Sequence, residues 1–344
     1  MIREALERIL DRSPMTPRTA RATFDVLLAP ETTDAERAAM LVALTARDGG
    51  PEELAAFALE MRRRARPFPI PPGDRPVDLC GSGGAPHPSF NVSTVSAFVV
   101  AATGTPVVKH GNRSARGLCG SSDLLEALGL PVTSDPDFAR ATYDRYRLAF
   151  LHAPLFHPAT GAVAEARRIV GIPTVFNRLG PLSNPARVPF QVVGVPNLEA
   201  AHRVAFALGR LGVRRGMAMT STEGADEFSP RAVTTTVLWD GEGTRTTRVR
   251  PDDLLPPDDR RGDWGSLPPS EAAEEARRVL AGGGGARRGS VLLTSGAALW
   301  IAGATSSLAK GVEIARQALD DGRAEELFSG VVALARDRRG PGGP

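Results

Sequence analysis

Cysteine, lysine and the aromatic residues are all scarce in this chain of 344 residues. The two cysteines, Cys80 and Cys119, have no metal-ligand spacing and are too few for a disulfide framework, which excludes a disulfide-stabilised fold. Aromatic residues make up 5% of the chain, so we expect a core built mainly from alanine, valine and leucine.

Long hydrophobic runs are also missing. The longest apolar stretch, near residues 95–108, is interrupted at 103–106 and is too short to span a bilayer. The first ten residues carry four charged side chains, which argues against a signal peptide. The sequence therefore predicts a protein without a membrane span that acts in the cytoplasm.

Charge of neither sign dominates the chain. The net charge is +3 and the sequence pI is about 9.3. Spread over the whole chain, this excess is too small to indicate nucleic-acid binding by itself. The basic residues are almost all arginine, with only two lysines, Lys109 and Lys310. Lysine and arginine are not interchangeable at a tight phosphate site, so a lysine in this chain is a candidate for function.

Proline divides the chain into two domains. Residues 67–76 contain five prolines, which predicts a linker. Residues 1–66 precede it and are predicted to form a helical domain, in which Thr33-Asp34 can cap one helix and Gly50-Pro51 can begin another. Residues 77–338 are predicted to form a larger α/β domain, and residues 339–344 a flexible tail.

Strands and helices are predicted to alternate after the linker. The expected strands lie near residues 77–79, 106–109, 148–152, 192–195 and 217–220. The expected helices lie near residues 95–103, 124–128, 162–170 and 198–211. This alternation is typical of an α/β domain with a mostly parallel central sheet.

The C-terminal third follows a different pattern. The turn at 240–243, Asp-Gly-Glu-Gly, predicts an antiparallel hairpin of residues 234–239 and 244–249. Residues 250–269 are rich in Asp, Arg and Pro and are predicted to form an exposed loop. Four helices are expected to close the chain, near residues 270–281, 290–303, 307–320 and 323–336.

A glycine-rich segment follows the first predicted strand. Gly81-Ser82-Gly83-Gly84 leaves that strand, and Asn91, Ser93 and Thr94 stand where the next helix begins. Glycines let a backbone approach a phosphate closely, and a helix N-terminus favours an anion. Read alone, the segment fits a capped glycine turn equally well. It lacks the dinucleotide-binding and Walker patterns.

A basic cluster follows the second strand. Lys109-His110-Gly111-Asn112-Arg113 ends it, and Gly117 to Asp123 leads into the next helix. Ligands in doubly wound sheets bind at the carboxyl ends of strands, so this cluster and the glycine segment are predicted to share one rim. Lys109 is then suited to neutralise a phosphate or pyrophosphate, although a basic turn facing solvent is the alternative.

Two adjacent carboxylates, Asp226 and Glu227, follow a third strand. Magnesium prefers one or two carboxylates together with substrate phosphates, so these residues can hold Mg²⁺. A pair of exposed acids in a turn is the simpler interpretation when the segment is considered alone.

Taken together, these segments resemble the anthranilate phosphoribosyltransferase family. The resemblance covers about residues 1–337 and adds Phe-His-Pro-Ala at 156–159 and Val-Phe-Asn-Arg-Leu-Gly-Pro-Leu-Ser-Asn-Pro-Ala at 175–186. It implies a nucleoside phosphorylase/phosphoribosyltransferase-like fold, with an N-terminal helical domain, an α/β domain and a donor site between them. It also implies a homodimer joined through the helical domains.

The resemblance also implies roles for individual residues. The donor would be phosphoribosyl pyrophosphate, bound by Gly81, Gly84, Ser89, Asn91, Val92, Ser93, Thr94, Lys109, His110, Gly111, Asn112, Arg113, Gly117 and Ser121. The acceptor would be anthranilate, bound by Gly81, Asn112, His157 and Arg167, with His157 lining its access channel and Arg167 binding its carboxylate. Lys109, Asn112 and Arg167 would be the catalytic residues. Mg²⁺ would be held by Ser93, Asp226 and Glu227.

The sequence departs from the family at one informative place. The family's loop usually reads Gly-Thr-Gly-Gly-Asp-Gly, whereas Ala85-Pro86 stands here in place of Asp-Gly. Another aromatic amine as acceptor is therefore an alternative. A non-catalytic nucleic-acid-binding paralogue is a second alternative, supported only by the high pI and the many arginines. A pyrimidine nucleoside phosphorylase is disfavoured, because its Lys-His-Ser-Thr-Gly-Gly loop is absent.

Overall fold

The computed structural model of the chain describes residues 2–47, 49–83, 87, 89–114 and 118–339. The N-terminal segment is helical, as predicted, and its elements are α1 (Ile2–Leu10), α2 (Pro17–Leu28), α3 (Asp34–Arg47) and α4 (Pro51–Arg64). Their apolar side chains, among them Phe24, Met40 and Phe57, pack into one buried cluster. This cluster extends beyond the four helices to residues of the α/β domain.

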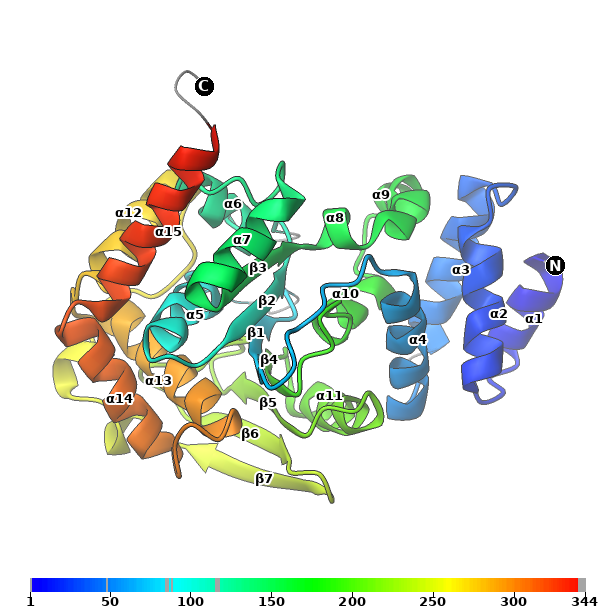
Figure 1. Cartoon of the computed structure of the whole chain (residues 1–344). Helices are drawn as coiled ribbons and strands as arrows, with labels where there is room; N and C mark the ends of the chain where they lie inside the picture. The colour runs from blue at the N-terminus through cyan, green and yellow to red at the C-terminus, as the bar shows by residue number, and fades with distance from the viewer. Residues whose placement is uncertain (1, 48, 84–86, 88, 115–117, 340–344) are drawn as a thin grey trace.

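A seven-stranded sheet forms the centre of the larger domain (Figure 1). Its strands are β1 (Val77–Gly81), β2 (Val107–Gly111), β3 (Leu148–His152), β4 (Phe190–Gly194), β5 (Arg215–Ser221), β6 (Thr234–Trp239) and β7 (Thr244–Val249). The order across the sheet is β3-β2-β1-β4-β5-β6-β7. The first five strands pair in parallel, and β6 and β7 form the predicted antiparallel hairpin at one edge. The mostly parallel sheet is confirmed.

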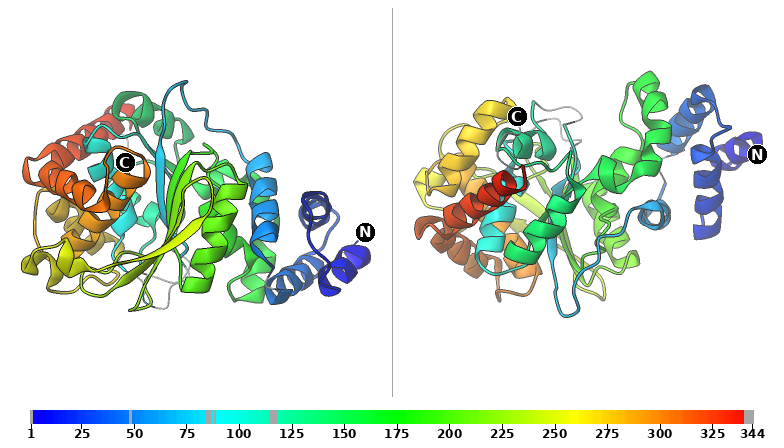
Figure 2. Two further views of the ribbon diagram at one scale, coloured as in Figure 1. Left: turned by 90° about the horizontal axis from the view of Figure 1, so that it is seen from below. Right: turned by 45° about the horizontal axis from the view of Figure 1, so that its top comes forward.

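Helices cover both faces of this sheet (Figure 2). One face is packed by α5 (Val92–Ala102), α12 (Pro269–Leu280), α13 (Ala286–Ile301), α14 (Leu308–Asp320) and α15 (Arg323–Arg339). The other face is packed by α11 (Leu198–Arg210). Strand residues alternate between these two clusters, since Leu79 faces the first and Cys80 the second. Two further helices complete the domain, α6 (Ser121–Ala127) and α7 (Pro136–Tyr146).

Residues 153–182 connect the sheet to the N-terminal helices. They form α8 (Ala153–Phe156), η1 (Pro158–Val163), α9 (Ala164–Val170), α10 (Val175–Leu179) and η2 (Gly180–Leu182). Ala166, Phe176 and Leu182 belong to the same buried cluster as Phe24 and Phe57. Figure 1 shows α9 and α10 beside α3 and α4. The domain boundaries drawn from the sequence stay a prediction, but in space this segment and the N-terminal helices pack together.

The prediction that residues 250–269 form an exposed loop is wrong. It contains two 3-10 turns, η3 (Pro251–Asp253) and η4 (Pro257–Arg260), and Leu255 and Trp264 are buried. Asp259 is buried as well, and its carboxylate pairs with Arg288 of α13 at 2.6 Å. The ion pair and the two buried apolar side chains fix the segment against the domain. The hydrophilic composition of the segment gave no sign of these contacts.

Among the described residues, no helix is both long enough and apolar enough to cross a lipid bilayer.

Candidate active site

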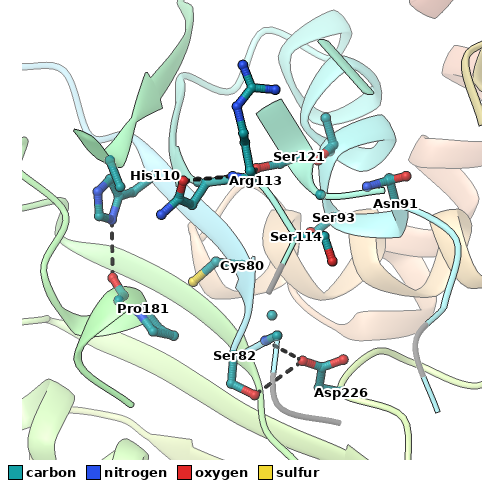
Figure 3. Close-up of a pocket in the computed structure, with 18 of the residues that line it drawn as sticks. Cys80, Ser82, Asn91, Ser93, His110, Arg113, Ser114, Ser121, Pro181 and Asp226 are labelled. Atoms are coloured by element: carbon teal, nitrogen blue, oxygen red, sulfur yellow. Dashed lines mark hydrogen bonds between the residues drawn. The ribbon is translucent and has the colours of Figure 1, made fainter. Parts of the chain in front are cut away.

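A cavity of about 270 Å³ lies at the carboxyl ends of β1 and β2, next to the start of α5 (Figure 3). It brings together most of the residues predicted from the sequence. They are Gly81, Ser89, Asn91, Ser93, Thr94, Lys109, His110, Gly111, Asn112, Arg113, Ser121, Arg167, Asp226 and Glu227. The common rim expected for the glycine segment and the basic cluster is therefore present in the structure.

Lys109 is one of the residues that line the cavity. Its side chain is 3% exposed, and Nζ donates hydrogen bonds to Leu79 O at 2.5 Å and to Ser93 Oγ at 3.1 Å. The Lys109 side chain leaves the face of β2 that packs against α5. Its ammonium lies between Leu79 of β1 and Ser93 in the first turn of α5. Because no described carboxylate pairs with it, its charge is available to an anionic ligand.

A buried carboxylate stabilises the strands behind this wall. Asp78 of β1 is fully buried and accepts hydrogen bonds from His110 N at 3.2 Å, Asn184 Nδ2 at 2.9 Å and Gln191 Nε2 at 3.2 Å. Burial raises the pKa of the Asp78 carboxyl to about 6, and the charge of Lys109 opposes this rise. Asp78 thus ties β1, β2 and β4 together where the cavity begins. No role for Asp78 was predicted from the sequence.

The two predicted metal-binding carboxylates have different surroundings. Asp226 Oδ2 accepts hydrogen bonds from Gly83 N at 2.9 Å and Ser82 Oγ at 3.2 Å, so it also holds the glycine segment (Figure 3). Glu227 Oε1 accepts from Ser93 N at 3.3 Å. Burial, and then the neighbouring Asp226 charge, raises the pKa of the Glu227 carboxyl to about 8; burial also raises the pKa of Asp226.

Glu227 keeps one oxygen free. Its Oε2 is buried and has no hydrogen-bond partner among the described residues, which is costly unless a ligand supplies one. The described part of the chain contains no group of three or more His, Cys, Asp or Glu side chains arranged for a metal. A cation here would therefore need ligands from a bound substrate, as Mg²⁺ commonly does.

The turn after β2 is held by its own side chains. Asn112 O accepts from Ser121 Oγ at 3.1 Å, and Arg113 pairs with Asp123 at 2.8 Å and Glu126 at 2.6 Å. Asp123 also accepts from Gly120 N at 2.9 Å. These contacts explain why the basic cluster turns back toward α6 and lines the cavity.

Arg167 of α9 reaches the cavity from the opposite side. Its Nη2 lies 3.4 Å from Asn177 Oδ1, and its guanidinium carbon lies 5.8 Å from the centre of the Phe176 ring. Burial lowers the pKa of this arginine. No carboxylate among the described residues pairs with it, so a bound carboxylate can accept its hydrogen bonds.

Two histidines lie together next to the cavity, and His110 lines it. The rings of His110 and His157 are 5.0 Å apart, and burial lowers their pKa values to about 3 and about 4. Both are therefore neutral near pH 7, and Nδ1 of His110 carries the proton that it donates to Gly180 O at 3.1 Å. His157 is buried and does not line the cavity, so its place in an acceptor channel stays a prediction.

Three other predicted residues are not placed in the cavity. Val92 is fully buried in the core against the sheet, and its backbone N–H is bonded to Phe90 O. Gly84 and Gly117 lie outside the described residues, as do Ala85 and Pro86.

One wall of the cavity was not predicted from the sequence. Phe176, Asn177, Gly180 and Pro181 line it, together with Ala153. The signal was present, since the string at 175–186 was noted but given no role. Only the packing of residues 153–182 beside the sheet shows that this string faces the glycine segment.

The two parts of the chain match two domains of a known class of enzyme. Residues 3–65 match the helical bundle domain of the glycosyl transferase family, and residues 73–325 match its α/β domain. The two matches, together with the helical segment and the mostly parallel sheet, thus define a glycosyl transferase of this two-domain class. The residues that line the cavity all belong to the α/β part.

Relatives of nearly full length identify the family more closely. The anthranilate phosphoribosyltransferase of Methanopyrus kandleri is 40% identical over 96% of this chain and 99% of its own, and that of Moorella thermoacetica is 38% identical over 97% and 98%. The crystal structure of the Thermus thermophilus enzyme superimposes with a TM-score of 0.87 at 37% identity, covering 96% of this chain and 99% of its own. The chain belongs to the anthranilate phosphoribosyltransferase family.

A more distant structure shares the fold. The Saccharomyces cerevisiae anthranilate phosphoribosyltransferase, solved in complex with phosphoribosyl pyrophosphate and Mg, has a TM-score of 0.85 at 23% identity and covers 98% of both chains.

Proposed function

We propose that this chain transfers the 5-phosphoribosyl group of phosphoribosyl pyrophosphate to the amine of anthranilate, a step in tryptophan biosynthesis. The amine nitrogen forms a bond to C1 of the ribose as the C1–O bond to pyrophosphate breaks, and the nitrogen then loses one proton. The products are N-(5-phosphoribosyl)anthranilate and pyrophosphate. One observation carries the proposal: one cavity has Lys109 and the start of α5 on one side and, on the other, Arg167, which pairs with no carboxylate of the described residues.

The donor would occupy the wall formed by β1, β2 and α5. Lys109 supplies a buried positive charge, and Ser93 and Thr94 lie in the first turn of α5, where N–H groups favour an anion. Gly81 lines the same wall, and its lack of a side chain lets Asp226 lie close to it, since a Cβ there would be 3.0 Å from Asp226 Oδ2. Lys109 and the start of α5 would stabilise the negative charge that builds up on the departing pyrophosphate, where preformed donors are most effective.

We further propose that Mg²⁺ is required. Asp226 and Glu227 fit this cation, because the buried Glu227 Oε2 has no hydrogen-bond partner among the described residues and Ser93 lies next to Glu227. These residues would hold the ion, with substrate phosphates completing its ligands. When bound, Mg²⁺ would supply positive charge that stabilises the leaving pyrophosphate. The yeast relative solved with the donor and Mg supports this reading.

Anthranilate would lie on the opposite wall. Arg167 offers a guanidinium for the acceptor's carboxylate, and the Phe176 ring restricts where that guanidinium lies. Asn112, exposed directly after β2, lines the cavity and would meet the same ligand. An aromatic amine is already nucleophilic, so orientation of the two substrates can supply much of the rate enhancement without a strong general base.

Detection of the products by mass spectrometry tests the acceptor. We expect N-(5-phosphoribosyl)anthranilate and pyrophosphate to form when the chain is given donor, Mg²⁺ and anthranilate, and EDTA to stop the reaction. The control is para-aminobenzoate, whose carboxylate is on the wrong side of the ring for Arg167. Turnover of para-aminobenzoate in preference to anthranilate would contradict the assignment.

We also propose that the chain is a cytoplasmic homodimer joined through its helical domain. Leu10 of α1 and Val42 of α3 are exposed by 67% and 47%, which is costly for apolar side chains in a monomer that has no partner for them. The cytoplasm is proposed because the donor carries several phosphate charges and does not cross a membrane unaided.

A further inference from the structure

The acceptor wall contains a short turn that is bound by side chains from three directions. α10 runs directly into η2, and Asn177, Gly180 and Pro181 all line the cavity. Asn177 also contacts Arg167. The position of η2 therefore affects both the shape of this wall and the guanidinium that faces the acceptor.

Each of the three carbonyls of η2 accepts a hydrogen bond from a different side chain. His110 of β2 binds Gly180 O at 3.1 Å, Gln191 of β4 binds Pro181 O, and Arg62 of α4 binds Leu182 O at 2.7 Å. Figure 3 shows the first of these bonds, from His110 toward the backbone beside Pro181. Two donors thus come from the sheet and the third comes from the N-terminal helices.

Arg62 is the unusual member of this set. It lies in the last turn of α4, is 5% exposed, and also donates from Nη1 to Leu211 O at 3.2 Å. No carboxylate pairs with it among the described residues, and its Nη2 is buried without a hydrogen-bond partner there. Burial lowers its pKa to about 10. A buried charge held only by backbone carbonyls is unfavourable for stability, which suggests that its value lies in what it positions.

We propose that Arg62, which does not touch the cavity, is a positioning residue for the acceptor side: by binding Leu182 O it fixes η2, and through η2 the wall of Asn177, Gly180 and Pro181. The inference rests on the proposed function, because it assumes that this wall binds anthranilate. The donor wall comes from β1, α5 and the end of β2. The hydrogen bonds of Arg62 go to Leu182 and Leu211, outside this wall, although its charge is close enough to interact with Asp78 and His110 behind it. Loss of Arg62 should therefore affect the two substrates unequally.

Steady-state kinetics of two variants tests this. In Arg62→Met, loss of a charge-assisted hydrogen bond should raise KM for anthranilate by about tenfold or more, while KM for phosphoribosyl pyrophosphate changes by less than about twofold. Arg62→Lys keeps the charge and one donor, so its KM for anthranilate should fall between the wild-type and Arg62→Met values. The matched control is Arg63→Met: Arg63 is half-exposed and pairs with Glu60, which keeps Arg64 as a partner.

The outcomes separate this inference from the proposed function. Should Arg62→Met fail to fold, as judged by a thermal melt, Arg62→Lys carries the test, and an unequal rise in the two KM values supports the inference. Equal changes in both KM values, or none in a folded variant, would overturn it while leaving the proposed function intact. A wild-type chain that does not turn over anthranilate would refute the proposed function, and this inference with it.

Discussion

Single charged residues in this chain are distinguished by how they are buried. Asp78 and Lys109 are both inside, yet each is surrounded by groups that satisfy it: three donors for the carboxylate, and a carbonyl and a hydroxyl for the ammonium. Arg167 is half-buried with no acidic partner among the described residues. Sequence spacing identified Lys109 as a candidate, but the role of Arg167 came only from the resemblance, because a helix face with two arginines carries no specific signal.

Replacement of Arg167 should affect the acceptor alone. In Arg167→Lys the planar pair of donors is lost, so KM for anthranilate should rise by about 10- to 100-fold while KM for the donor stays within about twofold. Arg168→Lys is the control, because Arg168 is exposed and pairs with Glu165. An unchanged KM for anthranilate in Arg167→Lys would show that this guanidinium does not bind the acceptor.

Asp78 should make stability depend on pH. Its pKa is raised to about 6 in the folded chain, above the ordinary value of 3.8 for an aspartate, so its contribution to stability is fully present below pH 3.8 and is lost as the pH rises through 6. Asp78→Asn cannot titrate. The amide loses hydrogen bonds at every pH. The difference between the Tm of Asp78→Asn and that of the wild type should nevertheless shift in favour of the variant as the pH rises from 4 to 7.

A surface carboxylate provides the opposite case. Hydrogen bonds from Glu242 N and Gly243 N lower the pKa of Asp240. The Tm of Asp240→Asn should therefore fall relative to that of the wild type as the pH rises from 3 to 5. Thermal melts of Asp78→Asn from pH 4 to 7 and of Asp240→Asn from pH 3 to 5 check the two signs. The same trend in both variants would mean that burial of Asp78 does not control its titration.

At the scale of elements, local signals predicted most of the fold. β3, β6 and β7 have the predicted bounds, because apolar or threonine-rich runs end at clear turns. α7 was missed although Asp135 caps it and Pro136 begins it. The packing of residues 153–182 against the N-terminal helices could not be predicted, because it depends on contacts between segments far apart in the sequence. The same is true of the cavity wall that these residues form.

The end of β4 illustrates how close the elements lie near the site. A Cβ atom built on Gly194 would lie 1.6 Å from Asp226 O, so Gly194→Ala should displace the segment that carries Asp226 and Glu227. We expect a loss of about 1–3 kcal/mol in the free energy of unfolding. We also expect weaker binding of Mg²⁺, so that more Mg²⁺ is needed for half-maximal activity. Gly243→Ala is the control, since a Cβ there meets nothing within 4 Å. Denaturant unfolding that finds both variants equally stable would contradict this packing.

For the whole molecule, the cavity lies between the carboxyl ends of β1 and β2 and the segment 153–182, which packs against the N-terminal helices. Association through those helices would leave the cavity free. Val42→Glu places a charge on the exposed face of α3, so it should convert the proposed dimer to a monomer at the same protein concentration. Light scattering after gel filtration checks both species. A dimer that persists in Val42→Glu would show that the interface lies elsewhere.

The central claim is that Lys109 and its neighbours bind the donor for transfer to anthranilate. The most direct test follows the loss of anthranilate fluorescence in the presence of phosphoribosyl pyrophosphate and Mg²⁺, for the wild-type chain, Lys109→Ala and Lys310→Ala. We predict turnover by the wild type, a fall in kcat/KM of about 100-fold or more in Lys109→Ala, and no change in Lys310→Ala, whose side chain is exposed on α14. Wild-type activity in Lys109→Ala would contradict the account.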